Sequence, residues 1–364
     1  MKKFWSAALA LILALSLVLT GCAPAVESSS SAESSVSEES SAPEESSESS
    51  KSSEASESSS ESESEPAGRA LMRIGGLKGP TSMGLVKVME DNDAGTFAND
   101  YEFTIAGAPD ELTPKLLQGE LDAAAVPANL ASVLYNNTEG AVQLLAINTL
   151  GVLYIVEKGE TVSSIEDLRG QTIYATNKGA TPEYALRYLL SQNGIDPDTD
   201  VTIEFKSEPT EVVAILSEAE SGIAMLPQPY VTVAMGSVEG LRIALDLTAE
   251  WDALDNGSAL VTGVLVVRKE YAEQNPEAVA AFLDEYAASV EFVNADNAAA
   301  AQLIEKFDIF KAAVAEKALP FCNITFISGA DAAEVLPGYL QVLYDQNPKS
   351  VGGALPGDDF YYGK

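Results

Sequence analysis

The chain has 364 residues, and its 55 acidic residues against 21 basic ones give a formal net charge of −34. So acidic a surface argues against nucleic acid or an anionic membrane face as a partner. The chain also contains no histidine, which excludes serine–histidine and cysteine–histidine nucleophiles and removes the commonest general base and metal ligand. We therefore expect no catalytic residues, no metal and no cofactor.

The first residues follow the pattern of an export signal. Lys2 and Lys3 precede an apolar stretch at about residues 7–19, which is too short to predict a membrane span. It ends in Leu19-Thr20-Gly21-Cys22, which resembles the bacterial lipobox. The resemblance implies a signal peptide over residues 1–21, a lipid anchor such as palmitate on Cys22, and a place on the extracytoplasmic face of a bacterial cell membrane. The alternative is an ordinary secretory signal with an incidental cysteine.

Residues 22–66 begin with Cys22 and continue as a tract made almost wholly of serine and glutamate, with twelve glutamates against Lys51. Such a tract holds too little apolar surface to offset the entropy of folding, and its like charges extend it. We expect a disordered tether between the anchor and the folded region. A phosphorylated or ion-binding acidic tract is the alternative.

Strands and helices alternate in the folded region, and their order repeats after one hundred residues. Thr81 pairs with Thr181, and Pro127 with Pro227, at the same offset. Alternating strands and helices imply βαβ units on parallel sheets, here two of them. The first unit has strands at 71–77 and 101–106, helices after Gly79-Pro80-Thr81-Ser82 and after Thr113-Pro114, and an apolar segment at 121–127. The second has strands at 171–176 and 201–205, helices after Gly179-Ala180-Thr181-Pro182 and after Pro209-Thr210, and a segment at 222–227.

Two β-branched segments, 151–158 and 263–269, follow the two units and predict strands that cross between two lobes. Lobe I then covers residues 67–150 and 263–364, and lobe II covers 151–262. The predicted fold class is α/β, with two lobes that are each a mostly parallel sheet flanked by helices, and a cleft between them. Helices from Asn275-Pro276 and at 298–307, 312–318 and 331–344 are expected to pack on lobe I, with Pro337 breaking or kinking the last.

Several motifs along the folded region are similar to those of a known family. The chain resembles type II solute-binding proteins of ABC importers, and it is most similar to the nitrate/sulfonate/taurine and thiamine-pyrimidine receptor group. The resemblance implies a type II periplasmic-binding-protein fold and a receptor that delivers a small solute to an ABC permease in the membrane. One departure is that no arginine pair is placed to clamp a sulfonate. The motifs are Gly75-Gly76-Leu77-Lys78-Gly79-Pro80-Thr81-Ser82-Met83-Gly84 and residues 121–127, 165–173, 225–229, 266–271 and 275–277.

The predicted binding site lies at the carboxyl ends of the parallel strands, where ligands collect in open α/β sheets. Helix starts at Gly79-Pro80-Thr81-Ser82 and Lys178-Gly179-Ala180-Thr181-Pro182, one from each lobe, would present backbone N–H groups to an anion or a carbonyl oxygen. The alternative is ordinary helix capping. Lys178 is the predicted cationic contact for an anion, or else a solvated lysine. The predicted ligand-binding residues are Gly79, Pro80, Thr81, Ser82, Pro127, Asn129, Asn148, Thr149, Asn177, Lys178, Gly179, Ala180, Thr181, Gln228 and Tyr230.

Within this set, the two strand-end loops are expected to supply hydrogen bonds through Asn129, Gln228 and Tyr230, and Tyr230 could stack on a flat ligand. Ordinary turn chemistry is the alternative for both loops. Trp251 and Cys322 are expected in the core rather than in the site.

The function that we expect is capture of a small solute without chemistry by a monomer, with bending near residues 149–153 and 262–265 closing the cleft. The alternatives are an enzyme on the same scaffold, similar to lyases, and a surface sensor that lacks transport. The solute stays open among flat heteroaromatics, small sulfonates, nitrate-like anions and short organic acids.

Overall fold

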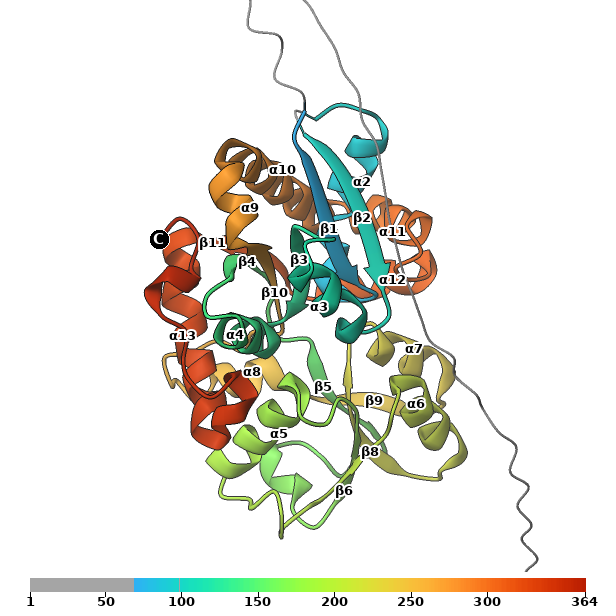
Figure 1. The fold of residues 1–364 in the computed structure, drawn as a ribbon. Coiled ribbons are helices and arrows are strands. Elements are labelled where there is room, and N and C mark those ends of the chain that lie inside the picture. The colour runs from blue at the N-terminus through green and yellow to red at the C-terminus, as the bar shows by residue number, and fades with distance from the viewer. Residues whose placement is uncertain (1–68, 98) are drawn as a thin grey trace, which may run out of the picture. The chain divides into compact units, whose positions relative to one another are not determined.

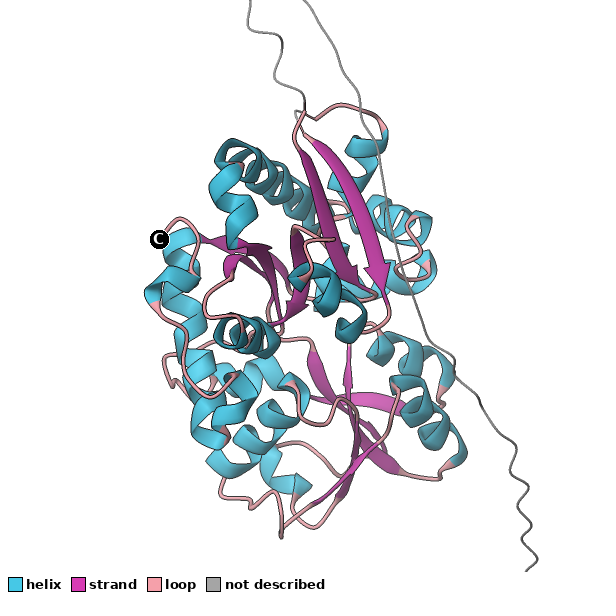
Figure 2. Cartoon of the chain, in the orientation of Figure 1, coloured by secondary structure: helices cyan, strands magenta, loops and turns pink. Residues whose placement is uncertain are grey.

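The computed structural model describes residues 69–97 and 99–364, all of which belong to the compact unit Ser64–Lys364. The predicted signal peptide, Cys22 and the acidic tether lie outside the described residues. Within them, no helix combines the length and the apolar character that crossing a membrane requires. Two β-sheets organise this part of the chain, with helices on both faces of each sheet (Figure 1, Figure 2).

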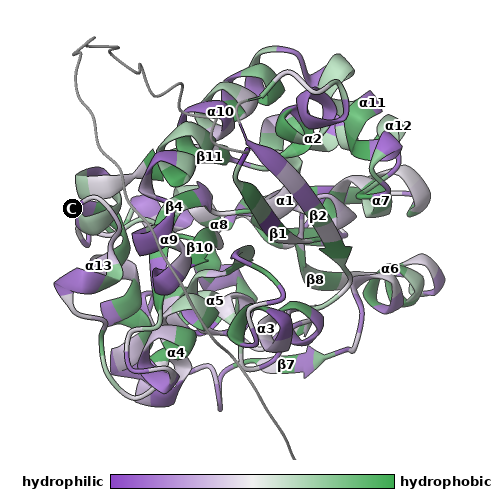
Figure 3. Ribbon diagram, turned by 45° about the horizontal axis from the view of Figure 1, so that its top comes forward, coloured by the Kyte–Doolittle hydropathy of each residue, from purple (hydrophilic) through white to green (hydrophobic). Residues whose placement is uncertain are grey.

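Lobe I is built on a six-stranded sheet with the strand order β11-β4-β10-β3-β1-β2. β1 pairs in parallel with β2 and β3, whereas β10 runs antiparallel to its neighbours β3 and β4. The edge strand β2 changes from hydrophilic at its start to hydrophobic at its end, beside a largely hydrophobic β1 (Figure 3). The strands are β1 (Leu71–Leu77), β2 (Asp100–Ala106), β3 (Ala123–Pro127), β4 (Val142–Thr149), β10 (Gly263–Arg268) and β11 (Ile324–Ser328).

Lobe II repeats this plan with five strands in the order β7-β6-β8-β5-β9. β6 pairs in parallel with β7 and β8, and β5 runs antiparallel to β8 and β9. The predicted fold class is confirmed, and both sheets are mixed: β10 and β11 run against the other strands of lobe I, and β5 runs against the other strands of lobe II. The strands are β5 (Leu153–Lys158), β6 (Thr172–Ala175), β7 (Thr202–Phe205), β8 (Gly222–Pro227) and β9 (Leu241–Asp246).

The chain crosses between the lobes at residues 150–152, between β4 and β5, and at residues 253–262, between α8 (Leu247–Asp252) and β10. Hydrogen bonds to Asn323 hold the first crossing in place. Asn323 Nδ2 donates to the carbonyl of Gly151 at 2.6 Å, and the Asn323 carbonyl accepts from the N–H of Leu150 at 3.1 Å. A Cβ atom at Gly151 would lie 2.1 Å from the hydroxyl of Thr248, so this crossing requires glycine.

The helices form one covering layer on each face of each sheet, and three hydrophobic clusters lie between the layers and the sheets. Alternate residues of β3 supply different clusters, because successive side chains of a strand point to opposite faces. In lobe I, one face carries α1 (Pro80–Met83), α2 (Val86–Asp93), α9 (Lys269–Gln274), α10 (Pro276–Ala295), α11 (Asn297–Lys306) and α12 (Ala312–Ala318), and the other carries α3 (Pro109–Leu117), α4 (Ala128–Asn137) and α13 (Gly329–Gln346). In lobe II, α5 (Thr181–Gln192) and α8 cover one face, and α6 (Pro209–Glu218) and α7 (Tyr230–Ser237) cover the other.

Short 3₁₀ turns complete the described chain: η1 (Ile165–Leu168), η2 (Leu319–Phe321), η3 (Pro348–Val351) and η4 (Asp358–Phe360). Cys322 follows η2 and is fully buried in the lobe I core, where burial raises the pKa of its thiol to about 12. This confirms the expectation that Cys322 acts as a small core residue.

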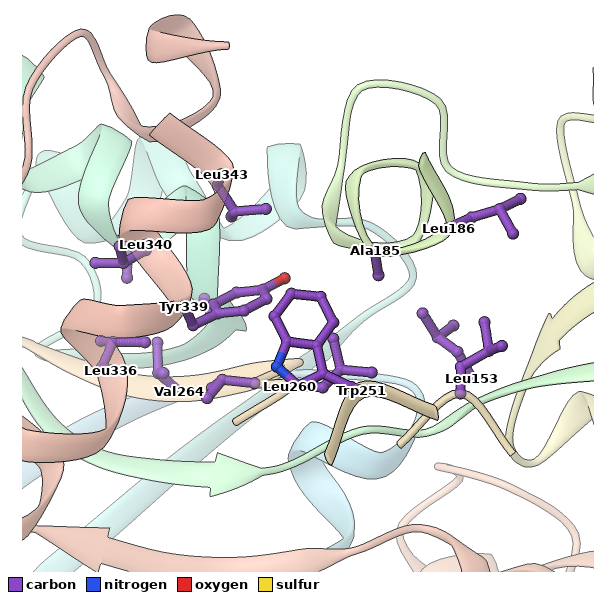
Figure 4. Packing of buried hydrophobic residues seen from close by; sticks show 14 of the residues in the cluster. Leu153, Ala185, Leu186, Trp251, Leu260, Val264, Leu336, Tyr339, Leu340 and Leu343 are labelled. Carbon is purple, nitrogen blue, oxygen red and sulfur yellow. The ribbon is translucent and has the colours of Figure 1, made fainter. Parts of the chain in front are cut away.

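One hydrophobic cluster extends through both lobes. Trp251 of α8, which is fully buried, packs its ring 4.8 Å from that of Tyr188 in α5 and 5.7 Å from that of Tyr339 in α13. Its Nε1 donates to the carbonyl and the hydroxyl of Ser258 at 3.2 and 3.1 Å. Figure 4 shows the indole between Tyr339 and Ala185, with Leu336, Leu340 and Leu343 lining the α13 side. The expectation that Trp251 is a core residue is confirmed.

The position of α13 corrects one expectation. α10 and α11 pack on lobe I as predicted, but α13 packs against β4 and β11 of lobe I and also against α5 of lobe II. Gln346 Nε2 donates to the Tyr184 carbonyl at 3.2 Å, and Asn347 Nδ2 donates to the Tyr184 hydroxyl at 3.2 Å. The last helix therefore joins both lobes, because its apolar face is wide enough to contact each of them.

Two helix predictions were wrong in detail, and a third was wrong in part. The helix expected after Thr113-Pro114 begins earlier, at Pro109, and contains both residues; the Thr113 hydroxyl donates to the Pro109 carbonyl at 2.9 Å. The first helix is divided into α1 and α2 by Gly84 and Leu85. Of the two effects predicted for Pro337, a break is contradicted, because α13 is continuous across it, and a kink stays a prediction. The sequence analysis also did not predict β4, β9, β11, α4, α7, α8 and α9.

A buried carboxylate connects three strands of lobe I. Asp122, which precedes β3, accepts from the Arg73 backbone N–H at 2.9 Å and from the Arg73 guanidinium at 2.9 and 2.8 Å. Arg268 Nη2 donates to it at 2.9 Å. Burial alone would raise the pKa of Asp122, but the hydrogen bonds from Arg73 and Arg268 outweigh it and hold the pKa below its usual value.

Candidate functional site

A cavity of about 280 Å³ lies between lobe I and lobe II. This volume lies just below the usual range for small-molecule sites, which begins at about 300 Å³. Each wall is made of turns that follow parallel strands, with Val152 and Thr262 from the two crossings between them. Lobe I contributes residues 77–81 after β1, 107 and 109 after β2, and 127 at the end of β3, and lobe II contributes 177 and 180–182 after β6, 208–209 after β7, and 227–230 after β8.

These six turns meet because the carboxyl ends of parallel strands lie at one edge of a sheet, and each turn leads directly into a helix. The starts of α1, α3, α4, α5, α6 and α7 therefore surround the cavity. None of these six helices has an N-cap hydrogen bond from the side chain of its own N-cap residue.

In lobe I, the turn after β1 is held close to the sheet by glycines. A Cβ atom at Gly76 would lie 2.3 Å from the Ser82 hydroxyl oxygen, and one at Gly263 would lie 2.5 Å from Thr81 Cγ2. The Thr81 carbonyl accepts from Asn148 Nδ2 at 3.1 Å. Glycine at these two positions lets α1 approach β1 and β10, which places Thr81 at the cavity wall.

In lobe II, the turn after β6 carries a left-handed residue, Asn177, with a φ of 58°. The Gly179 N–H donates to Glu183 Oε2 at 2.6 Å, which fixes the start of α5. Thr181 then reaches across to lobe I, where its hydroxyl donates to Asn129 Oδ1 at 3.4 Å. This hydrogen bond joins the two walls beside the cavity.

Two neutral polar residues line the cavity, Gln228 from lobe II and Thr262 from the second crossing. Gln228 is buried, and its Oε1 accepts from the N–H and the hydroxyl of Thr232 at 3.3 and 2.9 Å. Its amide Nε2 has no hydrogen-bond partner among the described residues. The Thr262 hydroxyl is buried and is likewise unpartnered within 69–97 and 99–364. The Gln228 amide nitrogen is free to bind a solute, whereas the Thr262 hydroxyl oxygen is covered by its neighbours.

Tyr230 forms an aromatic wall where the two lobes meet. Its ring lies edge-on to that of Phe310, from lobe I, with the centroids 5.6 Å apart. Burial, and after it the nearby carboxylate of Glu208, raises the pKa of the Tyr230 hydroxyl, so the hydroxyl stays protonated at neutral pH.

The sequence of the chain matches the model of the NMT1-like family over residues 105–307. The chain belongs to the NMT1-like family. The matched region runs from β2 to the end of α11 and so includes elements of both lobes. No curated protein sequence matches the chain.

Solved structures of binding proteins share the fold of this NMT1-like chain. At these low identities the likeness shows the fold. Three of them are an ABC transporter from Parabacteroides distasonis (22% identity, TM-score 0.68, covering 80% of this chain and 98% of that one), the periplasmic aliphatic sulphonate binding protein SsuA from Escherichia coli (17%, 0.63, 79% and 97%), and the periplasmic nitrate-binding protein NrtA from Synechocystis PCC 6803 (15%, 0.50, 66% and 67%).

In this NMT1-like chain, the residues predicted from the sequence divide into two groups. Nine of them line the cavity, namely Gly79, Pro80, Thr81, Pro127, Asn177, Ala180, Thr181, Gln228 and Tyr230. Six do not: Ser82, Asn129, Asn148, Thr149, Lys178 and Gly179.

Several residues of the second group contact neighbouring side chains or backbone groups instead of the cavity. Asn129 and Asn148 hold Thr181 and Thr81, and Thr149 donates its hydroxyl to Asn148 Oδ1 at 3.1 Å. Lys178 is exposed, with its Nζ 5.7 Å from the centroid of the Phe205 ring. The cationic contact predicted at Lys178 is therefore not at the cavity wall.

Sequence reasoning also missed residues that line the cavity, among them Lys78, Pro109, Glu208, Pro209 and Thr262. A signal for two of them was present. Pro109 and Pro209 are one hundred residues apart, and each is the first residue of its helix. No sequence pattern marks Thr262, because its place depends on how the second crossing returns to β10.

Proposed function

We propose that this NMT1-like chain is the solute-binding receptor of an ABC importer, and that its cavity captures a small molecule for delivery to a membrane permease. The observation that carries the proposal is the cavity between the lobes, which is walled by strand-to-helix turns from both repeated units. The names of the structures with the same fold support it, since they describe an ABC transporter and binding proteins for sulphonate and nitrate.

The mechanism that we propose is binding by closure. The nine predicted residues that line the cavity contact the solute from both sides, and bending near residues 149–153 and 262–265 brings the walls together. The solute stabilises the closed form because only that form offers both walls at once. The closed form then docks on the permease.

The finer parts of the proposal concern location and chemistry. We propose that residues 1–21 are removed, that Cys22 is lipidated, and that residues 22–66 tether a monomer to the extracytoplasmic face of a bacterial cell membrane. We also propose that the chain is not an enzyme. Glu208 is the one carboxylate among the cavity-lining residues, and no group of three or more potential metal ligands occurs in the described part of the chain.

A thermal-shift screen of the purified full chain tests the receptor function. Small sulfonates, nitrate, short organic acids and flat heteroaromatics are added one at a time. A solute that binds only the folded chain raises the melting temperature. At a solute concentration one hundred times its dissociation constant, the free energy of unfolding rises by about 2.7 kcal/mol. Melting temperatures that no member of the panel changes would count against a receptor and favour a surface sensor.

Replacing Tyr230 with alanine is expected to weaken binding of a solute found in that screen by about tenfold or more, because a half-buried aromatic wall is lost from the cavity. Titration calorimetry measures the change. Tyr344→Ala is the matched control, since Tyr344 is also partly buried but lies in α13, outside the cavity-lining set. Equal affinity of the two variants would show that Tyr230 does not contact the solute.

A further inference from the structure

The charges around the cavity point to the class of solute that it takes. The start of a helix presents backbone N–H groups and a positive dipole end, which by themselves favour an anion. At the start of α3, however, a carboxylate of the chain already occupies this place. Glu111 Oε1 accepts from the N–H groups of Gly107 and Ala108, both at 3.0 Å.

The same arrangement recurs in lobe II. At the start of α6, Glu211 Oε2 accepts from the Ser207 N–H at 3.2 Å. Glu111 and Glu211 stand one hundred residues apart, at the same place in the two repeated units. At the start of α5, Glu183 accepts from the Gly179 N–H, and Arg187 pairs at 2.8 Å both with Glu183 and with Asp198, which leaves this trio with one negative charge.

Two charged side chains line the cavity itself, Lys78 and Glu208. The charge of Lys78 is already paired, because its Nζ lies 2.7 Å from a carboxylate oxygen of Asp308. Glu208 is exposed and sits one residue before the start of α6. An anion in the cavity would therefore meet the Glu208 carboxylate and one paired lysine, and the starts of α3, α5 and α6 beside it already carry the negative charge of Glu111, Glu183 and Glu211.

The remaining surface of the cavity is apolar or neutral. Free hydrogen-bonding capacity comes from the Gln228 amide Nε2. Proline rings form much of the wall, and they offer rigid apolar surface without N–H groups. Seven of the lining residues are prolines: Pro80, Pro109, Pro127, Pro182, Pro209, Pro227 and Pro229.

We propose that the cavity selects a small solute without negative charge, with a compact apolar body that packs on the proline rings and Tyr230 and an acceptor that receives a hydrogen bond from Gln228 Nε2. The chain's own glutamates at the starts of α3, α5 and α6 reject oxyanions of the same size. This inference rests on the proposed receptor function and narrows its solute class.

Matched pairs of probes that differ in charge test the inference. Benzamide and benzoate, nicotinamide and nicotinate, and methanesulfonamide and methanesulfonate are titrated into the full chain by calorimetry, together with nitrate and taurine. We expect at least one uncharged member to bind tenfold or more tightly than its anionic partner. Tighter binding of an anion overturns the solute class and leaves the receptor function standing. If no probe binds, whether charged or uncharged, the result counts against the receptor function and against this inference as well.

A charge variant gives a second readout. Glu208→Gln removes the exposed carboxylate from the cavity wall. We expect it to raise the affinity for the anionic member of a bound pair by about threefold to fivefold, because the interaction of one solvent-exposed charge is weak. Glu218→Gln, at the far end of the same helix, is the matched control and should leave that affinity unchanged. An anion affinity that Glu208→Gln leaves unchanged or lowers would contradict the electrostatic part of the proposal.

Discussion

Replacing Trp251 with alanine is expected to lower the free energy of unfolding by about 3 to 5 kcal/mol, the usual cost of removing a large aromatic side chain from a core. The indole is fully buried, contacts Tyr188 and Tyr339, and donates to Ser258, so its loss leaves a cavity and an unpaired acceptor. The cost should be at the high end of this range, because the cavity would open where α5, α8 and α13 meet and none of them can close it alone.

Urea unfolding followed by far-ultraviolet circular dichroism measures this change. Phe321→Ala is the control, since the Phe321 side chain is 46% exposed and its loss should cost less than about 1 kcal/mol. A cost for Trp251→Ala that is no greater than that of the control would mean that the cluster between the lobes is not part of the folded core.

Replacing Asp122 with alanine is expected to cost about 3 kcal/mol, because it leaves the guanidinium groups of Arg73 and Arg268 without their shared partner. This value is at the low end for a broken buried pair, since both arginines are partly exposed and water can solvate them. Glu270→Ala is the matched control. Glu270 also pairs with Arg268, at 3.1 Å, but its side chain is 70% exposed, so its loss should cost about 1 kcal/mol or less.

The stabilisation from Asp122 is also expected to depend on pH. The pKa of Asp122 in the folded chain lies below its usual value, which is about 3.9 in an unfolded chain. Its contribution is therefore fully present above about pH 4 and is lost as pH falls through the folded-state pKa. The difference in unfolding free energy between the natural chain and Asp122→Asn should narrow as pH falls from 5 toward 2. A difference that stays constant over this range would show that Asp122 does not titrate with a lowered pKa.

The repeated order of strands and helices was visible in the sequence because each unit is marked by residues with few alternatives. Pro127 and Pro227 end β3 and β8, and Thr81 and Thr181 lie in the first turns of α1 and α5. The residue types at such positions are determined by local backbone geometry, so they can be recognised in a single sequence. The alternation then implied two sheets, and the structure contains them.

The elements that were missed depend on tertiary context. β4 ends in Asn148 and Thr149, polar residues that a pattern of hydrophobicity does not assign to a buried strand. Both are buried because Asn148 holds the Thr81 carbonyl, a contact between residues far apart in the sequence. The start of α3 was misplaced because Thr113-Pro114 imitates a helix start, whereas Pro109 is the true first residue.

For the candidate site, sequence reasoning found the turns more reliably than the side chains. Glycine and proline mark where a turn occurs, but whether Asn129 points into a cavity or toward Thr181 depends on the opposite lobe. The role of Glu111 and Glu211 likewise appears only when their carboxylates are seen to accept from the turns before α3 and α6.

The contact of α13 with both lobes has a consequence for protein engineering. A fragment that ends before Gly329 would lose Tyr339 and the leucines that cover Trp251, and would present that apolar surface to water. The chain should therefore melt in one cooperative step rather than lobe by lobe, since neither half carries a complete interior. A chimera that exchanges lobe II with a relative must exchange the facing side of the last helix as well.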